Sequence, residues 1–175
     1  MLAAHIALSH PDISFRLIKD GREELHTPGD GDLQSAVYAA MGREMVDKGT
    51  DVLLAPGMNI HRNPLCGRNF EYFSEDPLVT GKLAAAVVQG LQSAPVSACP
   101  KHFACNNQEY NRNHNNSVVS ARALREIYLR GFEICIKEAH PKNLMTSYNK
   151  INGVWSHYNY QLCTALLREE WGYTG

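Results

Sequence analysis

The sequence lacks the features by which several classes of protein are recognised. Its five cysteines include no CxxC pair, which argues against a zinc site built from paired thiolates. No apolar run approaches the roughly 20 residues that a membrane helix needs, so we expect no membrane span. The formal net charge is −1, without the basic excess typical of a nucleic-acid binder. We therefore expect no metal, no membrane and no nucleic acid among its partners.

Leader and phosphate-binding patterns are also missing. The first residues lack a charged start followed by a long apolar stretch, so they do not resemble a signal peptide, which favours a cytoplasmic location. No GxGxxG or GxxxxGK[ST] turn is present, which weakens a phosphate site. The cysteines are scattered and odd in number, as buried thiols in a reducing compartment would be. What is present, 44% hydrophobic and 20% charged residues, is typical of a globular protein.

Hydrophobic periodicity predicts alternating strands and helices. We expect helices at 32–48, 78–92, 120–139 and 160–170, and strands at 51–56, 96–103 and 143–148. The short apolar run at 51–56 predicts a buried parallel strand. Such alternation implies an α/β fold with a parallel sheet and right-handed crossovers. Residues 13–18 are a further strand candidate, and 26–32 reads as a loop. We treat 1–31 as an N-terminal segment of uncertain character and 32–175 as the α/β region.

The ends of these elements carry local signals. Asp32, Asp76 and Asn159 stand where each can cap the helix that follows. Gly172 is placed to stop the last helix. Pro100, which has no N–H to donate, is expected to end the ladder of the second strand.

Polar side chains gather directly after each of the three predicted strands. The first group is Asn59, His61, Arg62, Arg68, Asn69 and Glu71; the second is Lys101, His102, Asn106, Asn107, Glu109 and Arg112; the third is Tyr148 and Asn149. In parallel α/β folds the carboxyl ends of the strands form one face, where binding sites are built. These groups are mainly hydrogen-bond donors and amides, so they suit the hydroxyls of a neutral sugar better than a phosphate.

Several of these segments together resemble glycoside hydrolase family 3. They are LAPGMNIHRNPLCGR (54–68), GRNFEYFSEDP (67–77), KHFACNNQEYNR (101–112), MTSYNKING (145–153) and LREEWGYTG (167–175). The resemblance covers about residues 35–175. It implies a partial (β/α)8 TIM barrel of three to four βα units, from the N-terminal catalytic domain of a β-glucosidase-type enzyme.

The resemblance also implies roles for particular residues. The sugar hydroxyls would be bound by Arg68, Lys101, His102 and Arg112, and the pocket lined by Met145 and Tyr148. The substrate would carry a terminal β-D-glucosyl or xylosyl residue, with no cofactor required. KHFACNNQE stands where one N-acetylhexosaminidase subgroup has KHFPGHG, which favours the glucosidase or xylosidase type.

The same resemblance implies that the catalytic carboxylates are not in this chain. The family nucleophile is an Asp on the next strand, expected just after Gly175, and the acid/base usually comes from a later domain. Asp30 and Asp32 lie too close to the first helix to be the sugar-gripping Asp of the family's DGP motif. Glu71 and Glu109 are expected to pair with nearby cations. We therefore expect the isolated chain to be inactive without the remainder of the barrel and the C-terminal domain.

Two alternatives from other classes stay open on the sequence. One is a non-catalytic sugar-binding or scaffold protein that uses the same half-pocket. The other is an unrelated α/β enzyme that binds phosphate. Because a complete barrel takes about 250 residues, three βα units would leave open sheet edges, and we expect the isolated chain to be poorly soluble or partly ordered.

Overall fold

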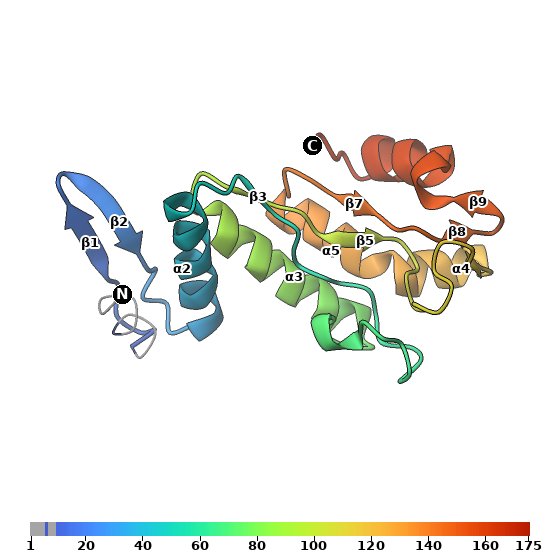
Figure 1. Cartoon of the computed structure of the whole chain (residues 1–175), viewed down its shortest axis with the longest axis horizontal. Helices are drawn as coiled ribbons and strands as arrows, with labels where there is room; N and C mark the ends of the chain where they lie inside the picture. Colours follow the sequence, from blue (N-terminus) through green and yellow to red (C-terminus); the bar gives the residue numbers. More distant parts are fainter. Residues whose placement is uncertain (1–5, 7–9) are drawn as a thin grey trace.

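The chain folds into helices and short strands that alternate along an elongated body (Figure 1). The computed structural model describes residue 6 and residues 10–175, so most of the segment considered as a leader lies outside the described residues. The strands are β1 (Arg16–Lys19), β2 (Arg22–His26), β3 (Val52–Leu53), β4 (Ser97–Ala98), β5 (Lys101–Phe103), β6 (Asn116–Ser117), β7 (Met145–Thr146), β8 (Lys150–Ile151) and β9 (Val154–Trp155). The helices are α2 (Leu33–Asp47), α3 (Pro77–Gln92), α4 (Ala121–Ala123) and α5 (Arg130–Ala139), with 3-10 turns η1 (Asn69–Glu71) and η3 (Ser156–Tyr158) and π-helical segments η2 (Leu124–Tyr128) and η4 (Gln161–Glu170).

The three predicted main strands lie side by side and run parallel. β3 pairs with β4, and β5 pairs with β7, both in parallel. A parallel bridge from Gly57 to Lys101 continues the first pairing. The α/β class is thus confirmed, and the described residues form no closed barrel. Within them, no helix combines the length and apolarity needed to cross a membrane.

Two expectations about these strands were wrong. Pro100 interrupts the second strand but does not end its ladder, because Lys101 N–H donates to Pro56 O at 2.9 Å and the Pro100 carbonyl accepts from Met145 N–H at 3.0 Å. The first strand is not buried: Val52 is 39% and Leu54 54% exposed. Among the described residues β3 has one strand neighbour, so its outer edge stays open.

Local chemistry sets the helix ends as expected. Asp76 Oδ1 accepts from the N–H groups of Leu78 and Val79, which caps α3. Asp32 and Asn159 accept in the same way from residues three positions on, at 3.3 and 3.1 Å. Gly172 follows η4 with a φ of +74°, the left-handed conformation that glycine adopts without a steric cost. The expected helix at 120–139 is present as the continuous run α4, η2 and α5.

Glycines let the helices approach closely. A Cβ on Gly81 of α3 would lie 2.9 Å from Ile134 Cβ and 3.0 Å from the Gly131 carbonyl of α5. A Cβ on Gly90 of α3 would lie 2.5 Å from Tyr38 Cβ of α2. At these two close approaches α3 packs against both α5 and α2, and it lies between them (Figure 1).

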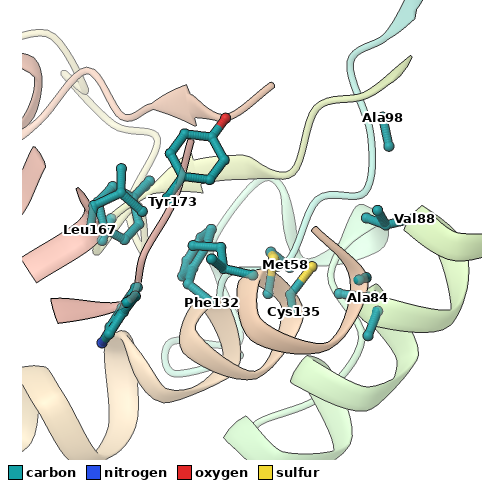
Figure 2. Packing of buried hydrophobic residues seen from close by; sticks show 14 of the residues in the cluster. Met58, Ala84, Val88, Ala98, Phe132, Cys135, Leu167 and Tyr173 are labelled. Carbon is teal, nitrogen blue, oxygen red and sulfur yellow. The ribbon is translucent and has the colours of Figure 1, made fainter. Parts of the chain in front are cut away.

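The hydrophobic core lies between these helices and the strands. Figure 2 shows Met58, Ala84, Val88, Phe132 and Cys135 packed together, with Leu167 and Tyr173 closing one side. The Phe132 ring meets Phe103 of β5 edge-on, with centroids 5.2 Å apart. Phe103 in turn meets Trp171 at 6.1 Å, so the C-terminal segment is tied to the strand that carries His102.

The N-terminal region contains a hairpin that the prediction missed in part. β1 and β2 pair antiparallel, with Asp20 and Gly21 at the turn, both at positive φ. The strand expected at 13–18 is shifted to β1, and the loop expected from His26 begins where β2 ends. An Asp-Gly pair between two extended segments is a strong local hairpin signal. A second small sheet, β6-β8-β9, follows the loops after β5 and β7.

Candidate functional site

Five charged side chains form a network beside the parallel strands. Glu71 accepts from Arg68 Nε at 2.5 Å and lies 3.1 Å from Lys101 Nζ. Glu109 accepts from Arg112 Nη1 at 3.2 Å, and its other carboxylate oxygen lies 4.0 Å from Arg68 Nε. Each carboxylate therefore engages two cations, which confirms that Glu71 and Glu109 pair with neighbouring positive charges.

Glu71 stays ionised in this setting. Burial alone would raise its pKa, but the Lys101 ammonium and the Arg68 guanidinium outweigh burial and lower the pKa below its ordinary value. Gly57 gives the carboxylate room, since a Cβ there would lie 3.0 Å from Glu71 Cγ. Glu71 thus acts as a fixed anion that orients two donors from different segments.

His102 lies beneath this network, 4% exposed. Its backbone is held on both sides by the Asn59 amide, which accepts from His102 N–H and donates to His102 O, each at 2.9 Å. Its Nδ1 lies 3.3 Å from the Tyr72 hydroxyl. Burial, with Arg68 and Lys101 nearby, lowers the pKa of His102 to about 4. The imidazole is therefore neutral near pH 7 and offers one donor and one acceptor.

Tyr148 and Met145 complete the group from the third strand. The Arg112 guanidinium carbon lies 4.9 Å from the centroid of the Tyr148 ring, a cation–π contact. Tyr148 is 60% exposed, so its other face is open to solvent. Met145 stands opposite Lys101 in the parallel ladder. The structure therefore brings all six predicted residues to one region.

Tyr72 is a further residue of this region that the sequence did not single out. It is 6% exposed, and its hydroxyl accepts from Asn106 Nδ2 at 3.2 Å while facing His102 Nδ1. Burial raises its pKa, so the phenol keeps its proton. In the segment GRNFEYF this tyrosine resembles the packing aromatic residues on either side of it. Only the fold shows that its hydroxyl faces His102.

The chemistry of the region suits a neutral polyhydroxylated ligand. Three cations face two carboxylates, and the amides and the neutral imidazole add groups that both donate and accept. In the part of the chain that is described, no group of three or more His, Cys, Asp or Glu side chains could hold a metal ion. The nearby Cys105 thiol is buried, which raises its pKa to about 12 and keeps it protonated.

Comparison with known proteins decides the family. The model of the glycosyl hydrolase family 3 N-terminal domain matches residues 26–175. The chain belongs to glycosyl hydrolase family 3. A β-glucosidase from Ruminococcus albus is 52% identical over 143 residues, which are 82% of this chain and 15% of that protein. An exo-α-(1→6)-L-arabinopyranosidase from Bifidobacterium longum is 50% identical over 139 residues, 79% of this chain and 18% of that protein.

Solved structures of the family share the fold. β-Glucosidase 3B from Thermotoga neapolitana, solved in complex with glucose, is 57% identical and superposes with a TM-score of 0.80, over 81% of this chain and 20% of that one. This family 3 chain therefore spans about 15–20% of the length of the relatives it matches. Its α/β architecture corresponds to part of their TIM-barrel-like domain, and the family resemblance predicted from the motifs is confirmed.

The lowered pKa of His102 predicts a pH-dependent contribution to stability. Between about pH 4 and 6.5 the imidazole is protonated in the unfolded chain but neutral in the folded chain. The contribution of the neutral imidazole to the free energy of unfolding is therefore complete above pH 6.5 and declines as the pH falls towards 4. We expect the difference in free energy of unfolding between the wild type and His102→Gln to shrink by about 2 kcal/mol from pH 7 to pH 5. Urea unfolding of the protein expressed from the complete reading frame, at both pH values, measures this change. A difference that stays constant with pH would contradict the assignment.

Proposed function

We propose that this chain forms the sugar-binding wall of a retaining β-glucosidase-like enzyme that hydrolyses terminal β-D-glucosyl residues. The single observation that carries the proposal is the convergence of Arg68, Lys101, His102, Arg112 and Tyr148 on one region. Arginine and lysine donate to hydroxyl oxygens, and the neutral His102 can donate or accept. Met145 and Tyr148 line the same wall from the third strand.

The chain's own acids do not fit the two catalytic roles. A retaining mechanism needs a nucleophile and an acid/base about 5–5.5 Å apart. Glu71 and Glu109 are each engaged by two cations, and the lowered pKa of Glu71 is the opposite of what a general acid requires. We infer that an Asp following Gly175 attacks the anomeric carbon and that an acid from a later domain protonates the leaving oxygen. This chain's residues bind the ring and hold it in place for both.

An aryl glycoside assay tests the proposal. The 175-residue chain alone is expected to release no p-nitrophenol from p-nitrophenyl β-D-glucoside, whereas the protein expressed from its complete reading frame is expected to turn it over. The β-D-xyloside and α-L-arabinopyranoside belong in the same assay, because one relative is an arabinopyranosidase. Sustained turnover by the purified 175-residue chain would show that its own carboxylates suffice.

A non-catalytic sugar-binding protein is the second candidate. It is favoured by the open face of Tyr148, which can stack on a sugar ring whether or not a reaction follows. Glucose binding by the protein of the complete reading frame, without turnover of any of the three glycosides, would identify it.

A further inference from the structure

Glu109 contacts two of the candidate sugar-binding residues and reaches a third through neighbouring polar side chains. One of its oxygens accepts from Arg112 Nη1 at 3.2 Å. The other accepts from Asn106 Nδ2 at 3.0 Å and lies 4.0 Å from Arg68 Nε. Asn106 Nδ2 also donates to the Tyr72 hydroxyl, which faces His102 Nδ1. A continuous path of polar contacts thus runs from Arg112 through Glu109 to His102.

The Arg112 side chain has few other restraints. It is 41% exposed, and among the described residues the guanidinium contacts Glu109 and the ring of Tyr148, which is itself largely exposed. A flexible arginine loses rotamer freedom when it binds a ligand, and a carboxylate that already holds it reduces that loss. Glu109 itself is 20% exposed and is anchored by Asn106, so it can serve as the fixed end of the pair.

We propose that Glu109 is a positioning residue that orients Arg112 towards the sugar and, through Asn106 and Tyr72, supports His102. Glu109 does not touch the reacting atoms; it acts through the donors that do. The inference rests on the proposed function, since it assigns Glu109 to the same sugar site. It predicts that a substitution of Glu109 weakens ligand binding much more when Arg112 is present than when Arg112 has been replaced.

A double-mutant cycle on the protein of the complete reading frame tests this dependence. Glu109→Gln replaces one acceptor oxygen by an amide NH2, which opposes either Arg112 Nη1 or Asn106 Nδ2. We expect the KM for p-nitrophenyl β-D-glucoside and the Kd of glucose to rise about tenfold, equivalent to about 1.4 kcal/mol. In an Arg112→Met background the same substitution is expected to raise both constants less than about threefold, because the group it positions is gone.

Controls separate positioning from general damage. Glu75→Gln removes the same charge from an exposed loop position and is expected to leave both constants unchanged. If Glu109→Gln lowers the melting temperature, Glu109→Asp, which keeps the charge but withdraws the oxygens by one methylene, is expected to weaken binding without that loss. Equal fold-changes in both backgrounds, or no change in the single variants, would overturn the inference while the wild type still binds glucose. A wild type that neither binds glucose nor cleaves the glycosides would instead overturn the proposed function, and the inference with it.

Discussion

Phe132→Ala is expected to lower the free energy of unfolding by about 3–5 kcal/mol, the usual cost of removing a buried phenylalanine. Phe132 is 1% exposed on α5, and its ring packs edge-on against Phe103. The alanine variant loses the apolar area of the ring and leaves a cavity that the close-packed helices cannot fill. Against a total stability of about 5–15 kcal/mol, this is enough to unfold much of the domain at 37 °C.

The loss should also reach the site. Phe103 follows His102 directly in β5 and also contacts Trp171. A cavity at Phe132 therefore loosens the strand that carries the two candidate sugar-binding residues Lys101 and His102. Thermal melting and glucose binding of the protein expressed from the complete reading frame measure the two effects. Tyr110→Ala, at a residue 86% exposed, serves as the control and is expected to change stability by no more than about 0.5 kcal/mol. A Phe132→Ala variant that melts with the wild type would show that this cluster does not hold the domain together.

Gly81→Leu is expected to destabilise the protein by about 3 kcal/mol through overpacking at the crossing of α3 and α5. Even a single Cβ at this position would come within 3.0 Å of the Gly131 carbonyl and 2.9 Å of Ile134 Cβ. Backbone atoms cannot swing away as a flexible side chain does, so the helices must separate. Leucine's better helix propensity, worth about 1 kcal/mol relative to glycine, offsets only part of that cost.

Urea unfolding of the variant and of Val79→Leu, an enlargement at a position 44% exposed on the same helix, provides the comparison. The control is expected to stay within about 0.5 kcal/mol of the wild type. If Gly81→Leu is as stable as Val79→Leu, the close approach of α3 and α5 is not required for the fold.

The helix termini show what can be read locally. Asp32, Asp76 and Asn159 were expected as caps, and each accepts from a backbone N–H within the first turn. Such a bond joins residues two or three apart, so sequence alone contains both partners. The hairpin at Asp20 and Gly21 is equally local, and its signal was present in the sequence although it was passed over.

The glycines of α3 show the opposite case. From the sequence, Gly81 and Gly90 only weaken the prediction of a helix, because glycine has low helix propensity. In the structure they are the points at which α5 and α2 approach α3, and the residues that they contact lie about 50 positions away in the sequence. Pro100 was misjudged for the same reason, since the Lys101 N–H and the Pro100 carbonyl find their partners at Pro56 and Met145, about 45 residues away in the sequence.

For the site, the sequence alone determined the residue types, their place after three strands and the family. The parallel α/β class follows from the alternation of strands and helices, and that alternation is a pattern that the sequence itself displays. Only the tertiary structure decided which carboxylate holds which cation, that Tyr72 faces His102, and that burial keeps this imidazole neutral. Those features depend on distances between groups about 30–40 residues apart and on the exclusion of water around them, which no local pattern encodes.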